Sequence, residues 1–178
     1  MTMLSAAVYI DGANLYHTQK AMGLDIDFKA LRRYLASRYR LIRLNYYTAI
    51  DTSGEYVSIT PLIDWLAYNG YSVVTKEMVS YTQANGDIRR KGNLDVDMAI
   101  DALDHAVNAR PDVVTLITGD GDFVPLVRAL QRRGAIVQAV SSLRPNMIAD
   151  ELRRAVDDYI DLEEWRKIIA RERAQAVA

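Results

Sequence analysis

Short apolar runs alternate along the chain with longer amphipathic segments. The runs are rich in branched and aromatic residues, which predicts strands over residues 6–10, 41–50, 71–79, 113–118 and 135–140. Apolar residues at helical spacing predict helices over residues 14–22, 28–35, 60–69, 94–107, 123–133, 146–156 and 163–173. Strands and helices that alternate in this way form a parallel sheet covered on both faces. We therefore expect an α/β fold, a three-layer sandwich around a mostly parallel sheet of about five strands.

The helix expected over residues 94–107 carries one apolar stripe, which we expect to face the core. The stripe consists of Val96, Ala99, Ile100, Leu103 and Val107. By helical geometry, Asp95 and Asp97 lie on opposite flanks of this stripe, and Asp101 points further towards solvent. Periodicity by itself does not choose between Asp95 and Asp97 as the residue that turns inward.

Length, hydrophobicity and charge limit the number of domains and the kinds of partner that we expect. A chain of 178 residues without an obvious linker or repeat fits a single domain over 1–178, with a terminal helix at about 162–175. No apolar run reaches the roughly 18 residues that a membrane helix needs, so we expect a cytoplasmic protein with no membrane partner. The formal net charge of −1 means that any polyanion would be held by a local basic patch.

The chain has no cysteine and only two histidines, His17 and His105. Disulfides, thiolate nucleophiles and cysteine-based zinc sites are thereby excluded, and histidine-based zinc sites are disfavoured. Any metal would be bound by oxygen, which favours Mg²⁺ or Mn²⁺.

Aspartates occur where an α/β sheet would bring them together. Asp11 follows the first strand, Asp120 and Asp122 follow the fourth, and Asp95 and Asp97 begin a helix. Ligands of open parallel sheets bind outside the carboxyl ends of the strands, near the point where the strand order reverses. Carboxylates gathered there repel one another unless a cation neutralises them. Their gathering therefore favours a metal site.

Each of these residues also has a purely structural interpretation. Asp11 and Gly12 could form a tight turn, Asp122 could cap a helix that begins at Phe123, and Asp95 suits the positive end of a helix dipole. Asn14 could bind a water or a phosphate oxygen, or could serve in helix capping. Thr118 offers a hydroxyl at the same edge.

Cations and aromatic residues suggest further contacts. The run Arg89, Arg90 and Lys91 lies in an expected polar loop with a turn at 85–87, where it could meet a phosphate backbone or simply be solvated. Three tyrosines could stack on bases, or could belong to the core and surface: Tyr46, Tyr47 and Tyr81.

Three motifs, in this order, resemble those of the NYN domain family and most of all its LabA-like bacterial branch. They are Tyr-Ile-Asp-Gly-Ala-Asn-Leu at 9–15, Lys-Gly-Asn-Leu-Asp-Val-Asp at 91–97 and Thr-Gly-Asp-Gly-Asp-Phe at 118–123. The resemblance, over about residues 6–161, implies a PIN-like nuclease fold with an acidic pocket that binds Mg²⁺ or Mn²⁺ for RNA cleavage.

Matched residue by residue, the resemblance implies roles for particular side chains. Asp11, Asp95, Asp120 and Asp122 match the catalytic and metal-binding acids, and Asn14 matches the motif asparagine. Asp97 and Asp101 are further candidate ligands. Asn14, Thr118, Arg90 and Lys91 are the expected substrate contacts. The last motif commonly has serine where this chain has Thr118 and Gly121, a departure that keeps the first hydroxyl and loses the second.

The predicted function is metal-dependent hydrolysis of RNA. The alternative is a catalytically weak or inactive regulatory module that binds RNA or a protein, and self-association or a protein partner is compatible with either. A phosphatase of the haloacid dehalogenase type is rejected because Ala13 occupies the position of its second aspartate. Gly119 and Gly121 lack the third glycine of a dinucleotide site.

Overall fold

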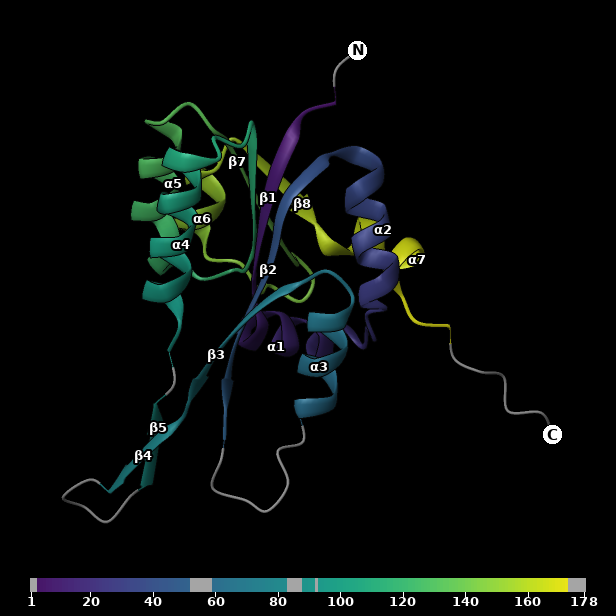
Figure 1. Ribbon diagram of the computed structural model, residues 1–178. Coiled ribbons are helices and arrows are strands. Elements are labelled where there is room, and N and C mark those ends of the chain that lie inside the picture. Colours follow the sequence, from purple (N-terminus) through teal and green to yellow (C-terminus); the bar gives the residue numbers. More distant parts are fainter. Residues whose placement is uncertain (1–2, 52–58, 83–87, 92, 173–178) are drawn as a thin grey trace.

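The computed structural model describes residues 3–51, 59–82, 88–91 and 93–172, with the backbone alone for 79–82 and 88–91. Six strands form a wholly parallel sheet in the order β3-β2-β1-β6-β7-β8 (Figure 1). Their bounds are β1 Ser5–Asp11, β2 Arg40–Ile50, β3 Ser72–Glu77, β6 Val113–Ile117, β7 Ile136–Ser141 and β8 Asp158–Asp161. The α/β sandwich expected from the alternating pattern is confirmed.

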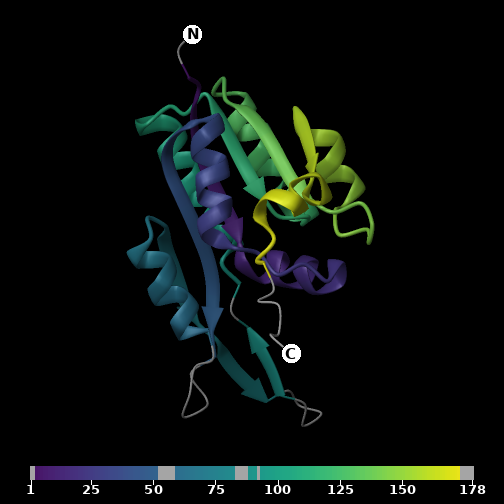
Figure 2. The same cartoon turned by 90° about the vertical axis from the view of Figure 1, so that its right-hand side faces the viewer.

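Helices cover both faces of the sheet (Figures 1 and 2). The helices are α1 Gly12–Met22, α2 Phe28–Arg38, α3 Thr60–Tyr68, α4 Asp95–Asn108, α5 Val124–Gln131, α6 Asp150–Ala155 and α7 Leu162–Ile169. Helices α4, α5 and α6 share one core cluster with the sheet, and α1, α2, α3 and α7 share the other.

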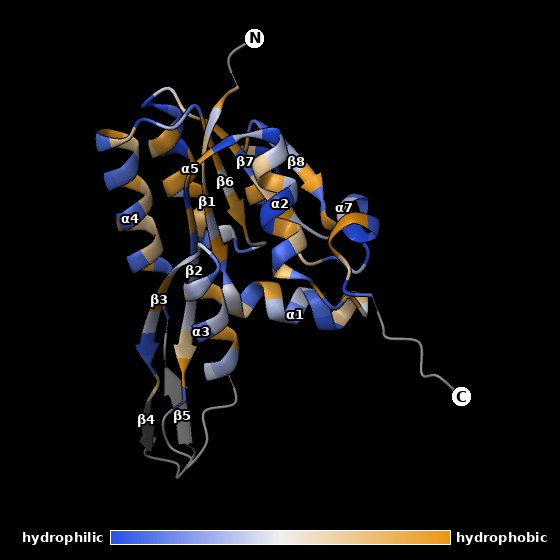
Figure 3. Ribbon diagram, turned by 45° about the vertical axis from the view of Figure 1, so that its right-hand side comes forward, coloured by the Kyte–Doolittle hydropathy of each residue, from blue (hydrophilic) through white to orange (hydrophobic). Residues whose placement is uncertain are grey.

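The central strand β1 supplies both cores. Tyr9 and Ile10 are fully buried and belong to opposite clusters, because successive side chains of a strand point to opposite faces. Figure 3 shows hydrophobic colour along the central strands and hydrophilic colour on outer surfaces of α2, α4 and α7. A strand buried on both faces reads as a continuous apolar run, which is why β1 was predictable.

The sheet has six strands, whereas about five were expected. The sixth strand, β8, pairs with β7 at the edge and was not predicted, because its four residues begin and end with Asp158 and Asp161. So short a segment with acidic ends has neither the apolar run nor the length that signals a strand.

The expected third strand and polar loop contain a hairpin. Strand β3 ends at Glu77, and β4 (Val79–Thr82) then pairs antiparallel with β5 (Ile88–Lys91). Residues 88–91 were expected in a loop and form a strand instead. The expected turn at 85–87 lies outside the described residues. The hairpin extends from the end of the sheet where β1 meets α1 (Figures 1 and 2).

Helix α4 presents a different face to the core from the one predicted. Its buried residues are Met98, Ala102 and Ala106, whereas more than half of the surface of Val96, Ile100 and Val107 is exposed. The prediction failed because Met98 and the small Ala102 and Ala106 fit closely against the sheet, and periodicity gives no weight to small size. The apolar stripe therefore lies largely on the surface.

The helix boundaries are partly as expected. Asp27 caps α2 by accepting hydrogen bonds from the backbone nitrogens of Lys29 and Ala30 at 2.8 and 3.1 Å. The terminal helix α7 ends at Ile169, earlier than expected, because Ala170 forms an antiparallel bridge with Ile26. Among the described residues, no helix is long and apolar enough to span a membrane.

Candidate active site

The site lies where the strand order reverses. Strands β2 and β6 flank β1 on opposite sides, and the chain leaves β1 for one flank and returns later to the other. Asp11 is the last residue of β1, and Asp120 stands three residues beyond the end of β6. Both aspartates therefore occupy the carboxyl edge of neighbouring strands, where open α/β sheets bind ligands.

Hydrogen bonds fix the Asp11 carboxylate. Its Oδ1 accepts from the backbone nitrogen of Asn14 at 3.0 Å, which caps α1, and its Oδ2 accepts from the Thr118 hydroxyl at 3.0 Å. The side-chain oxygen of Asn14 in turn accepts from the Gly119 backbone nitrogen at 3.0 Å. These contacts tie the loop after β1 to the loop after β6, so Asn14 has a structural role here.

The second loop is ordered around Asp120. Its backbone nitrogen donates to the Thr118 hydroxyl at 3.2 Å, and its Oδ1 accepts from the backbone nitrogen of Asp122 at 2.9 Å. Asp120 thereby caps a short 3₁₀-helix, Gly121–Phe123, before α5 begins at Val124. The cap expected from Asp122 is thus supplied by Asp120, since the helical segment starts two residues earlier than predicted.

Two glycines permit the close approach of these loops. A Cβ on Gly119 would collide with the backbone oxygen of Met147, and one on Gly12 would come within 2.6 Å of the Tyr47 backbone oxygen. Backbone atoms cannot move aside as a flexible side chain can. Both motifs therefore require glycine for packing.

Three carboxylates line one cavity of about 490 Å³: Asp11, Asp95 and Asp120. We call this cavity the acidic pocket. Asp95 reaches it from the first position of α4, where the side chain of Asn93 accepts a hydrogen bond from the Asp95 backbone nitrogen at 2.7 Å. The structure thus brings Asp95, and not Asp97, to the pocket.

Two carboxylates of the acidic pocket, Asp11 and Asp95, resist ionisation. Burial raises the pKa of Asp11, and the charge of Asp120 raises it further, while the hydrogen bonds from Asn14 and Thr118 act in the opposite direction. Burial also raises the pKa of Asp95, with added repulsion from Asp11 and Asp120. The three acids therefore feel one another's charge.

Several predicted site residues have other surroundings. Asp97 forms an ion pair with Lys76 at 3.0 Å, and Asp101 accepts a hydrogen bond from the Tyr47 hydroxyl at 2.9 Å. Asp101 is therefore less exposed to solvent than expected. Asp122 acts on Asp95 electrostatically but does not line the acidic pocket.

The expected cationic contacts are only partly described. Arg90 and Lys91 belong to β5, and their side chains lie outside the described residues. Among side chains that the structure does describe, no three acidic or histidine residues have the spacing of a finished metal site.

His17 lines the acidic pocket and was not predicted as part of it. Asn14 and His17 are three residues apart on α1, so they are neighbours on the surface of the helix. That spacing is the signal in the sequence that would have found His17.

A family model for the NYN domain matches residues 5–163. The chain belongs to the NYN domain family. It is 31% identical over 167 residues to "Low amplitude and bright protein LabA" of Synechococcus elongatus, a match that covers 92% of this chain and 86% of LabA. It is also 35% identical over 51 residues to an uncharacterised protein of Methanocaldococcus jannaschii, which covers 29% of this chain and 21% of that protein. The resemblance to the LabA-like branch is confirmed.

The NYN fold also occurs in a crystal structure of a protein of unknown function from Vibrio parahaemolyticus. The TM-score is 0.75 at 21% sequence identity, and the match covers 94% of this chain and 96% of that one. At that identity the likeness shows the fold alone.

The departure from the last NYN motif has a structural account. The Thr118 hydroxyl donates to Asp11, so the hydroxyl expected at this position is present and engaged. A Cβ on Gly121 would come within 2.5 Å of a carboxylate oxygen of Glu151, so the site of the second departure is occupied by that side chain.

Proposed function

We propose that this NYN protein is a ribonuclease that hydrolyses RNA phosphodiester bonds in the acidic pocket with the help of Mg²⁺ or Mn²⁺. One observation carries the proposal: acids from three separate segments, Asp11, Asp95 and Asp120, line one cavity at the reversal of strand order. Such an arrangement destabilises the apo protein through burial and repulsion, and a bound cation would relieve it.

The donor set fits the ion in its chemistry. Carboxylate oxygens are the ligands of Mg²⁺ and Mn²⁺, and Asp11, Asp95 and Asp120 would hold the ion. These side chains line one cavity, although among the described residues they do not have the spacing of a finished metal site. A divalent cation would lower the pKa of the attacking water and would neutralise the negative charge that develops on the leaving oxygen.

Neighbouring residues prepare these acids for the task. The hydrogen bonds from Thr118 and the Asn14 backbone favour the charged form of Asp11, which is the form that binds a cation. Asp122 lies two residues from Asp120 and outside the pocket lining, and its charge would act on the site through its electrostatic effect on Asp95.

Cleavage of labelled RNA with Mn²⁺, with Mg²⁺ and with EDTA tests the proposal. Asp120→Asn should reduce cleavage at least about 100-fold, because loss of a metal ligand removes more than an outer-shell change would. Asp104→Asn is the matched control, since Asp104 is an exposed acid of α4 that bonds Asn108 at 2.7 Å. If wild-type protein cleaves no RNA with either cation, the nuclease proposal fails.

An exposed apolar stripe favours a second candidate, a regulatory module that binds a protein while turning over little RNA. Within the apolar stripe of α4, the exposed residues are Val96, Ile100 and Val107. Such a surface is typical of association. Analytical ultracentrifugation of wild type and Ile100→Glu tests self-association through it, with Asp104→Asn again as the control. A monomeric wild-type protein that cleaves RNA would argue against this candidate.

A further inference from the structure

Three adjoining cavities follow α1 from the acidic pocket outward. A second cavity, the central groove, has a volume of about 880 Å³, and a third, the basic end, has about 510 Å³. His17 and Thr48 line both the acidic pocket and the central groove, and Tyr16 and Gln19 line both the central groove and the basic end. Shared lining residues make the three cavities one path along a single helix.

The central groove carries aromatic rings at its rim. Tyr16 on α1 is 50% exposed and Trp65 on α3 is 37% exposed, whereas Tyr46 and Phe28, which also line the groove, are buried. The ring of Tyr16 meets the ring of His17 edge-on, with 5.6 Å between the centroids. Exposed rings on two sides of a groove are surfaces on which planar groups can stack.

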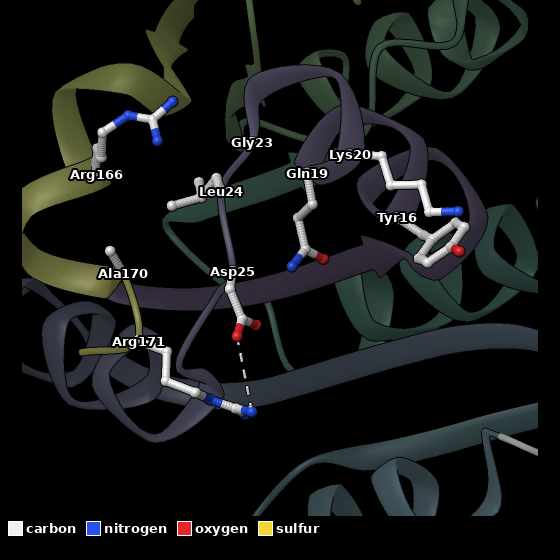
Figure 4. Close-up of a pocket in the computed structure, with 9 residues that line it drawn as sticks. All are labelled: Tyr16, Gln19, Lys20, Gly23, Leu24, Asp25, Arg166, Ala170 and Arg171. Atoms are coloured by element: carbon white, nitrogen blue, oxygen red, sulfur yellow. Dashed lines mark ion pairs between the residues drawn. The ribbon is translucent and has the colours of Figure 1, made fainter. Parts of the chain in front are cut away.

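Three cationic residues line the basic end: Lys20, Arg166 and Arg171 (Figure 4). The Lys20 nitrogen lies 4.6 Å from the centroid of the Tyr16 ring, beside which Figure 4 shows it. Among the described residues, the one acid that lines this cavity is Asp25, whose exposed ion pair with Arg171 is long at 3.9 Å. Exposed pairs of this kind are weak, so a polyanion can compete for the guanidinium.

We infer that the central groove and the basic end bind single-stranded RNA and lead it to the acidic pocket, an inference that rests on the proposed function. Bases would stack on Tyr16 and Trp65, and phosphates would meet Lys20 and Arg171. The acidic pocket is lined by three acids, whereas the basic end is lined by three cations together with Asp25. One of these cations, Arg166, is paired with Glu163 at 2.7 Å, which leaves Lys20 and Arg171 as the cations for phosphate. A duplex does not fit this chemistry, because its base faces are already stacked.

Fluorescence anisotropy with a labelled 12-nucleotide oligouridine RNA tests the inference. The titration is done in EDTA at low salt, so that binding is measured without cleavage. Tyr16→Ala and Trp65→Ala should each weaken binding about 5- to 150-fold, the loss of one stacked base. Tyr16→Phe and Trp65→Tyr keep a ring and should restore most of the affinity.

Tyr68→Ala is the matched control. Tyr68 lies on α3 with Trp65 and is 89% exposed, but it lines none of the three cavities. This variant should bind as wild type does. Circular dichroism and thermal melting establish that every variant is folded.

The outcomes separate this inference from the nuclease proposal. The groove assignment is overturned if wild type does not bind the RNA, if the alanine variants bind as tightly as Tyr68→Ala, or if duplex RNA binds equally well. RNA binding that depends on Tyr16 and Trp65, in a protein without cleavage under Mn²⁺, upholds the groove and overturns the nuclease. RNA cleavage that is unchanged in Tyr16→Ala and Trp65→Ala upholds the nuclease and overturns the groove.

Discussion

The acidic pocket and the central groove adjoin, yet they are built differently. In the acidic pocket Asp11 is held by the Asn14 backbone and the Thr118 hydroxyl, and its charge is opposed by burial and by Asp120. In the groove, Tyr16 and Trp65 are partly exposed. Fixed and mutually repelling groups suit a reaction that needs precise placement. Exposed rings suit a ligand that is held with little regard to sequence.

The largest effect should separate the two regions. Asp11→Asn combined with Asp95→Asn should lower RNA cleavage at least about 100-fold while RNA binding in EDTA stays the same or tightens, because two negative charges are removed. Asparagine caps a helix about as well as aspartate, so α1 is retained. Parallel cleavage and anisotropy titrations make the measurement. If binding falls together with cleavage, the two regions do not act separately.

Gly119→Ala should damage the acidic pocket through packing. The added Cβ would collide with the Met147 backbone oxygen, and we expect a loss of about 2 kcal/mol or more in the free energy of unfolding. Gly121→Ala is the control, since its Cβ would meet the flexible end of Glu151, and its loss should be about 1 kcal/mol or less. Urea denaturation gives both values, and equal losses would contradict the close approach at Gly119.

Metal binding should depend on pH more than RNA binding in the groove does. Burial raises the pKa of Asp11 and of Asp95, so protons compete with the cation at higher pH than they do at ordinary carboxylates. Manganese affinity should therefore fall as pH is lowered, by up to about tenfold per pH unit for each proton displaced. Calorimetric titration with Mn²⁺ from pH 7.5 downward measures it. An affinity that is flat across this range would argue against these ligands.

The smallest effect concerns stability without metal. When folding raises the pKa of an acid, the folded protein is more stable at low pH, where the acid is protonated, than at neutral pH. The extra stability is fully present below the unfolded pKa of about 4, and it is lost as pH rises through the pKa of the folded state. Asp11→Asn should therefore raise the melting temperature by a few degrees at pH 7 in EDTA and change little near pH 3. Scanning calorimetry with Asp104→Asn as the control tests the sign, and a lower melting temperature for Asp11→Asn at pH 7 would contradict it.

Much of the fold was predictable because its central part is locally encoded. Strands β1 and β6 are buried on both faces, so each appears as an apolar run that ends just before or at a polar motif. That pattern placed Asp11 and Asp120 at the reversal of strand order, where the structure has them. Strand β8 and the hairpin β4–β5 escaped prediction because edge and paired polar strands carry no such run.

The sequence did not predict which aromatic rings are buried and which are exposed. Tyr46 and Tyr47 were candidates for stacking on bases, but both are buried in the core. Tyr81 has a side chain outside the described residues. Tyr16 and Trp65 are the exposed rings of the groove, and no local pattern distinguishes an exposed ring from a buried one.

The sequence by itself determined the α/β architecture, the glycine-bearing motifs and the aspartates at the ends of β1 and β6, since each depends on residues that are close along the chain. The rotation of α4 was decided only by tertiary packing. Met98, Ala102 and Ala106 turn towards the sheet because small side chains allow the helix to approach it, which leaves Val96 and Ile100 on the surface. The same rotation brings Asp95 into the acidic pocket and pairs Asp97 with Lys76, a choice between two neighbours that helical periodicity does not contain.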